Sequence, residues 1–159
     1  MTYSIVARDA ADGHMGIATQ SQAFSVGSSV SWAAPGHGVI ATQSMGEPMY
    51  GELGLAGLSA GLTAPEALTS LKSVDPHPER RQVAMVDSQG NVAAYTGAAC
   101  VAAAGHEIGN GCAAVGNLVS SSEVWTSMLA PFEAGSGWLP RRLMDSLDAA
   151  EAAGGDIRG

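Results

Sequence analysis

The sequence predicts an α+β sandwich in which antiparallel sheets are covered by helices. Strand-like runs occur in pairs joined by short turns, which is typical of hairpins, and helix-like runs with capping signals are grouped elsewhere. The chain has 159 residues, of which 46% are hydrophobic. This is enough to build the core of one domain spanning residues 1–159.

The first hairpin is expected directly after Met1. Residues 2–8 form a strand-like run, the segment 9–13 ends in the turn signal Asp-Gly, and residues 14–20 read as the return strand. A third strand is expected over residues 38–44.

A second hairpin is expected in the middle of the chain. Residues 81–87 and 92–96 flank Ser88-Gln89-Gly90-Asn91, which has the composition of a turn. One further strand is expected over residues 113–119.

Three helices are expected from capping signals or helical spacing. The segment 63–66 has the spacing of a capping box and opens a helix toward Lys72. The segment 120–123 has the same spacing, so a second helix should run toward Phe132. Leu and Ala recur at helical spacing over residues 139–150, which predicts the third.

The charge balance excludes two classes of partner. Acidic residues outnumber Lys and Arg by 15 to 7, and the formal net charge is −8. Nucleic acid and anionic membranes are therefore poor partners. With neither a basic leader nor a run of about 18 apolar residues, the expected location is cytoplasmic.

Metal and cofactor motifs are missing from the sequence. Four histidines lie far apart without metal-ligand spacing, and no glycine-rich nucleotide loop is present. Cys100 and Cys112 are expected to be free thiols. The sequence therefore predicts no metal and no cofactor.

The segment Gly57-Leu58-Ser59-Ala60-Gly61 matches the nucleophile elbow of α/β-hydrolases, but its context does not. An elbow needs a hydrophobic strand before the serine and a helix after it, and neither is expected here. Ser59 is instead expected in the last turn of a short helix, with Gly61 just beyond that helix.

One pentapeptide occurs twice, at 17–21 and at 40–44, both times as Ile-Ala-Thr-Gln-Ser. In a strand, its Ala and Gln share one face, so each copy should present an amide beside a small residue. A chance repeat of strand-forming residues is the alternative.

Thr2 is the strongest candidate for a reactive group. If Met1 is removed, Thr2 carries a free α-amine with a pKa of roughly 8, which can take the proton from its own hydroxyl. This pairing of a hydroxyl nucleophile with the amine of the same residue as its base is a known variant of the serine-protease mechanism. The alternative is an ordinary strand residue, and a retained Met1 would place the Thr2 nitrogen in a peptide bond.

Several segments together resemble a known family. They occur in the family's order and spacing, and they are residues 2–9, 20–27, 41–51, 81–87 and 152–159. In these segments the chain resembles the bacterial family catalogued as domain of unknown function 1028. The resemblance implies an N-terminal-nucleophile hydrolase-like fold, a four-layer α-β-β-α sandwich, in which the residue that begins the first strand attacks an amide-type bond.

The resemblance also raises a question about the end of the chain. Family members continue past the segment 155–159 into another hydrophobic strand. We therefore expect that strand to come from a second polypeptide, produced by cleavage after Gly159, or from a swapped partner. If that cleavage is autocatalytic, the nucleophile begins the other chain, and Thr2 is an ordinary residue.

The remaining site residues are assigned by their places at expected strand ends and in the loop after residue 44. Asn117 and then Gln43 are the expected oxyanion donors. Substrate contacts are expected from Gln20, Ser21, Glu47 and Tyr50. Each of these residues also has an ordinary structural interpretation.

The walls of the expected site consist of small Ala and Ser residues, which favours a small-molecule substrate. Hydrolysis of an amide or related C–N bond is the expected reaction. A non-catalytic binding or assembly protein of the same fold stays open as an alternative. Large apolar residues are available for surface patches, and a homo-oligomer is expected from them; they are Trp32, Met45, Met49, Trp125 and Trp138.

Overall fold

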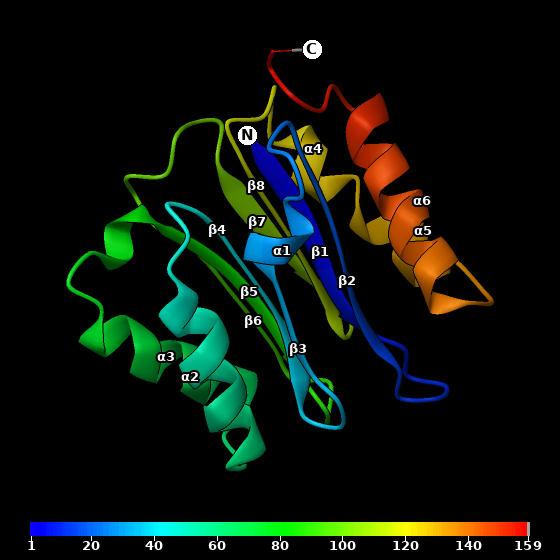
Figure 1. Ribbon diagram of the computed structural model, residues 1–159. Coiled ribbons are helices and arrows are strands. Elements are labelled where there is room, and N and C mark those ends of the chain that lie inside the picture. Colours follow the sequence, from blue (N-terminus) through cyan, green and yellow to red (C-terminus); the bar gives the residue numbers. More distant parts are fainter. Residues whose placement is uncertain (159) are drawn as a thin grey trace.

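Two four-stranded antiparallel sheets form the centre of the protein, as seen in a computed structural model that describes residues 1–158 (Figure 1). The first sheet has the strand order β2-β1-β8-β7. Its strands are β1 (Thr2–Arg8), β2 (Met15–Ser21), β7 (Gly105–Gly109) and β8 (Cys112–Asn117). The second sheet has the order β3-β4-β5-β6. Its strands are β3 (Ser31–Ala34), β4 (Gly38–Ser44), β5 (Arg81–Asp87) and β6 (Val92–Thr96).

Helices cover the outer face of each sheet, so the molecule has four layers (Figure 1). The second sheet is covered by α2 (Pro48–Ser59) and α3 (Ala64–Val74). The first is covered by α4 (Glu123–Thr126), α5 (Leu129–Ala134) and α6 (Leu139–Ala152). Two short pieces complete the secondary structure, namely α1 (Gly27–Val30) and the 3₁₀ turn η1 (Pro78–Arg80).

The core consists of three hydrophobic clusters. One lies between the sheets and contains only Val and Ala among its buried members, such as Val6, Ala41 and Val86. The other two lie between each sheet and its helices and contain the larger side chains, including Tyr3 and Phe132 on one side. Because protein interiors are packed with few voids, the small side chains between the two sheets allow the sheets to lie close together.

Most of the expected elements are confirmed. The α+β class with antiparallel sheets is correct, as are both hairpins and the strand over 38–44. The capping box at Thr63 forms in both directions, since its hydroxyl accepts from the Glu66 amide and the Glu66 carboxylate accepts from the Thr63 amide. Ser59 is the last residue of α2, and Gly61 follows it with φ +96°. This is a helix end, not an elbow.

The prediction of one continuous helix from 120–123 toward Phe132 is wrong. The segment is split into α4 and α5, and Ser122 at the start of α4 makes no capping hydrogen bond through its side chain. The Ser120 amide donates to the carbonyl of Gly155, so this residue is tied to the C-terminal segment. The Ser127 hydroxyl lies 3.1 Å from the Val124 carbonyl and 3.2 Å from that of Ala149, at the break between the two helices.

Three general findings concern the part of the chain that the structure describes. Cys100 and Cys112 are free thiols. Within residues 1–158, no three His, Cys, Asp or Glu side chains are grouped so that they could hold a metal ion. None of the helices there combines the length and the apolar character needed to cross a membrane.

Candidate functional site

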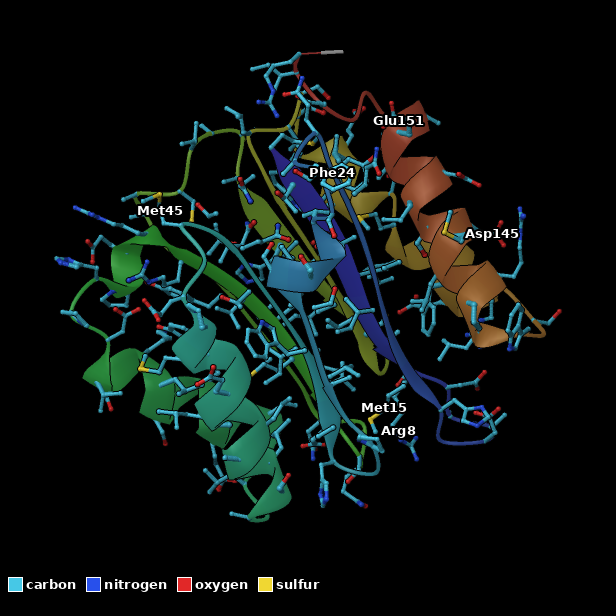
Figure 2. All side chains as sticks on the ribbon, in the orientation of Figure 1. Arg8, Met15, Phe24, Met45, Asp145 and Glu151 are labelled. Carbon is cyan, nitrogen blue, oxygen red and sulfur yellow. The ribbon has the colours of Figure 1, made fainter. Side chains whose placement is uncertain are left out.

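A pocket of about 320 Å³ lies at the N-terminal end of β1. Its lining residues come from four segments, and they are Thr2; Ala23, Val26, Ser29 and Val30; Thr42, Gln43 and Ser44; and Gly46 and Pro48. None of the lining residues is charged. Figure 2 shows Phe24 and Met45 at this end of the sandwich, with Arg8 and Met15 at the other end. We call this cavity the Thr2 pocket.

Three buried amide side chains meet beside Thr2. Gln82 is fully buried, and its Nε2 donates to the carbonyl oxygens of Gly116 (2.7 Å) and Gly105 (3.0 Å). Carbonyl oxygens only accept, so these two bonds fix the orientation of the Gln82 amide. Its Oε1 therefore accepts from the amides of Gln43 (2.8 Å) and Asn117 (3.0 Å).

Gln43 and Asn117 also hold the backbone of Thr2. The Thr2 carbonyl accepts from Gln43 Nε2 at 3.0 Å and from Asn117 Nδ2 at 3.4 Å. An amide NH₂ group has two hydrogens, and in both residues both are engaged. Their predicted role as oxyanion donors would require breaking one of these bonds. The geometry favours them as groups that position Thr2.

The Thr2 hydroxyl is occupied by its own neighbours. It donates to the Met1 carbonyl at 2.7 Å and lies 3.3 Å from the Ser21 hydroxyl, which donates to the same carbonyl at 2.6 Å. Burial lowers the pKa of the Met1 amine, and the Arg158 guanidinium lowers it further. While Met1 is present, Thr2 has neither a free amine nor a free hydroxyl.

A buried ion pair supports one wall of the Thr2 pocket. Arg81 is the strand partner of Ser44, and its Nη1 donates to the Met45 carbonyl at 2.7 Å. Its Nε donates to the carboxylate of Asp75 at 2.8 Å, and this bond lowers the pKa of Asp75 to about 2. Ser44 itself has φ +68°, a conformation that costs a non-glycine residue energy. The ion pair therefore helps to hold the chain after β4 in its turn.

Comparisons with known proteins place the chain in a family. The family of unknown function DUF1028 matches residues 2–159. The chain belongs to this family. A crystal structure of a Silicibacter pomeroyi protein, also assigned to DUF1028, is similar with a TM-score of 0.92 and 32% sequence identity. The alignment covers 96% of this chain and 68% of that one. A comparison with curated proteins gave no match.

The DUF1028 resemblance in the sequence is thus confirmed, and it brings no function with it, because none is assigned to the family. The structure brings four of the predicted residues together at the Thr2 pocket or directly beside it, namely Thr2, Ser21, Gln43 and Asn117. Glu47 lies at the edge of this group, where it caps α2 through the Met49 amide and stands 3.9 Å from Arg81.

Two predicted substrate contacts lie elsewhere. Tyr50 is fully buried in the core beneath α2, where burial and then the Asp75 carboxylate raise the pKa of its hydroxyl. Gln20 is exposed and lies on the same face of β2 as Ala18, which packs toward the helices over the first sheet. Neither lines the Thr2 pocket. Gly159, the predicted processing site, lies outside the described residues.

Sequence reasoning missed two residues of this region. Gln82 is the hub of the amide group, and a signal for it existed, since it alternates with Ala84 and Val86 on the inward face of an expected strand. Ser44 stands in the sequence only as the last residue of a repeat. Its positive φ has no sequence signal that separates it from Ser21.

Proposed function

We propose that this chain is a hydrolase of the N-terminal-nucleophile type, with the hydroxyl of Thr2 as its nucleophile once Met1 has been removed. The observation that carries the proposal is the placement of Thr2. It is the first residue of the inner strand β1, it lines the Thr2 pocket, and two buried amides hold its carbonyl. A reactive group needs such fixed positioning.

Removal of Met1 would free three groups at once. Thr2 would gain an α-amine, and the hydroxyls of Thr2 and Ser21 would lose the carbonyl that both now contact. The two hydroxyl oxygens already lie 3.3 Å apart. Ser21 is thus placed to orient the Thr2 hydroxyl toward the pocket.

The proposed reaction has two steps. The Thr2 hydroxyl oxygen attacks the carbonyl carbon of the substrate, its proton passes to the Thr2 amine, and the C–N bond breaks as the leaving nitrogen takes up that proton. Water then hydrolyses the Thr2 ester. We assign the oxyanion contact to the Ser44 hydroxyl, which lines the same pocket and has no hydrogen-bond partner within residues 1–158.

The proposed substrate is small and uncharged. The Thr2 pocket has a volume of about 320 Å³, and its polar groups are hydroxyls and amides without a charged side chain. A charged substrate group would lose its hydration without gaining an ion pair, which is unfavourable.

A second candidate is a non-catalytic binding protein of the same fold. One observation favours it: the Met1 side chain packs against the core beneath β1, and the Met1 carbonyl accepts two hydrogen bonds. A protein that keeps Met1 keeps these contacts, but its Thr2 has no free α-amine.

Covalent labelling tests the proposed nucleophile. The full-length protein is treated with a β-lactone probe, which acylates activated hydroxyl groups, and the labelled residue is located by peptide mass spectrometry. We expect one label, on Thr2. Thr2→Ser should keep the label, Thr2→Ala should lose it, and Thr69→Ala, at an exposed position of α3, serves as the matched control.

Each other outcome has a definite meaning. A label on a second polypeptide would move the nucleophile to another chain. Absence of any label from a protein shown to begin at Thr2 would favour the binding protein and would overturn the proposed hydrolase.

A further inference from the structure

The lining residues of the Thr2 pocket differ in character from one part to another. Beside Thr2, the end of β4 supplies polar atoms from the side chains of Gln43 and Ser44. The loop after β2 and the short helix α1 supply a second part, and its residues are Ala23, Val26, Ser29 and Val30. We call these four residues the α1 wall. The two parts should contact different portions of a bound molecule.

The α1 wall offers no free hydrogen-bond donor from its side chains. Ser29 carries its only polar side chain, and this hydroxyl donates its single hydrogen to the Val26 carbonyl at 3.1 Å. Val30 is buried in the hydrophobic cluster between the sheets, and Val26 packs against that cluster. An apolar group that lies against this wall therefore leaves water without depriving a polar side chain of its partner.

Phe24 adds an aromatic ring beside the α1 wall. It lies in the chain between the lining residues Ala23 and Val26, and it is 102% exposed, so none of residues 1–158 covers its ring. Figure 2 shows it at the end of the sandwich where β1 begins. The next residue, Ser25, has φ +56°, a left-handed conformation that costs a non-glycine residue energy. Backbone strain of this kind is concentrated in segments that contact ligands.

The loop that carries Phe24 is tied to the proposed nucleophile. The Ala23 amide donates to the Ser21 hydroxyl oxygen at 3.2 Å, and that oxygen lies 3.3 Å from the Thr2 hydroxyl oxygen. A molecule that extends from the Thr2 hydroxyl along this loop therefore meets the α1 wall.

We propose that the substrate of the Thr2 pocket is a small amide that carries an apolar hydrocarbon group. The amide lies beside the hydroxyls of Thr2 and Ser44, and the hydrocarbon group lies against the α1 wall and the Phe24 ring. This inference rests on the function proposed for Thr2 and adds a substrate class to it. Because apolar surface then supplies the affinity, each added methylene group should strengthen binding about fourfold until the wall is covered.

Binding of two simple amides tests the α1 wall separately from the reaction. Butyramide and hexanamide differ by two methylene groups, and each is titrated into the ¹⁵N-labelled full chain carrying Thr2→Ala, so that Thr2 cannot hydrolyse the probe. The assigned backbone amide signals of residues 23–30 are followed by NMR. We expect saturable shifts of these signals, and hexanamide should bind about fifteenfold more tightly than butyramide.

Two further substitutions in the same chain test the proposed contacts. Val26→Thr keeps the branched shape of the side chain and adds a hydroxyl, and it should weaken hexanamide binding about tenfold. Phe24→Ala removes the exposed ring and should weaken binding about fivefold. Trp138→Ala is the matched control, because this exposed aromatic residue lines no part of the Thr2 pocket, and it should bind hexanamide normally.

Three results would overturn the proposed substrate class. These are no shift at residues 23–30 up to the solubility limit of hexanamide, equal affinity for the two amides, or unchanged hexanamide affinity in both Val26→Thr and Phe24→Ala. All three are measured without the Thr2 hydroxyl, so they do not depend on the reaction. Normal hexanamide binding together with no β-lactone label on the wild-type chain would remove the hydrolase and leave the apolar amide as the ligand.

Discussion

The two copies of Ile-Ala-Thr-Gln-Ser, in β2 and in β4, have the same sequence and opposite orientations. In β4, Ile40 packs beneath α2 while Ala41 and Gln43 point between the sheets. In β2, Ile17 points between the sheets, Ala18 packs toward the helices and Gln20 is exposed.

The difference teaches what a strand pattern can and cannot determine. Alternation decides which residues share a face, but the choice of face depends on the neighbours. β4 has a strand on each side and helices over it, whereas β2 is an edge strand. Only the copy in β4 therefore delivers its glutamine to Thr2.

The isoleucines should show the largest loss of stability. Ile40 is fully buried, and Ile40→Ala should lower the free energy of unfolding by about 4 kcal/mol, near the upper part of the range for buried isoleucine. Ile17 is only partly buried, and Ile17→Ala should cost about half as much. Urea unfolding of both variants measures this, and equal losses would show that the two copies are packed alike.

The glutamines come next. Gln43→Ala removes the partner of the Thr2 carbonyl, of Gln82 Oε1 and of the Ser4 hydroxyl, and it should cost about 3 kcal/mol. Gln20→Ala, at an exposed position, should change stability by less than about 0.5 kcal/mol. The same unfolding assay compares them, and a small loss for Gln43→Ala would contradict the role given to the amide group.

The threonines should differ in sign. The Thr42 hydroxyl is buried and has no hydrogen-bond partner among residues 1–158, so Thr42→Val should stabilise the protein by up to about 1 kcal/mol. The Thr19 hydroxyl lies 2.8 Å from that of Ser4, and Thr19→Val should destabilise by about 1 kcal/mol. Thermal unfolding at one pH resolves the signs, and a destabilising Thr42→Val would reveal a partner for that hydroxyl.

The serines at the ends of the copies should show the smallest effect. Ser44 has φ +68°, which glycine adopts without strain, so Ser44→Gly should stabilise the protein by about 0.5 kcal/mol. Ser21 lies in a strand and bonds the Met1 carbonyl, and Ser21→Gly should destabilise by about 1 kcal/mol. The two melting temperatures should move in opposite directions, and a shift of both in one direction would contradict the account.

Regular elements were predictable where local signals were long enough. Turn residues predicted the two hairpins, and residue spacing predicted the capping box at Thr63. The short α1, β3 and β7 were missed, because four or five residues give too little periodicity. The single helix expected after 120–123 is broken near Ser127, whose hydroxyl contacts the Ala149 carbonyl of α6, and no local pattern reveals that contact.

The site was predictable in part, and for the same reason. Thr2 and Gln43 were predicted as site residues from their places in strands, and both line the Thr2 pocket. The prediction for Gln20 assumed that equivalent positions of the two repeats face the same way. Tyr50 was expected in a loop, but it lies in α2 and is buried. Which face of β2 is covered depends on α6 and on the opposite sheet, and these contacts are set by tertiary packing.

The central claim is that Thr2 becomes the amino terminus, and the most direct test is the intact mass of the natively expressed full-length gene product under denaturing conditions, with N-terminal sequencing of every species. The account predicts a chain that begins at Thr2. A chain that keeps Met1 would contradict it, and a further fragment beginning with Thr, Ser or Cys would place the nucleophile on that fragment.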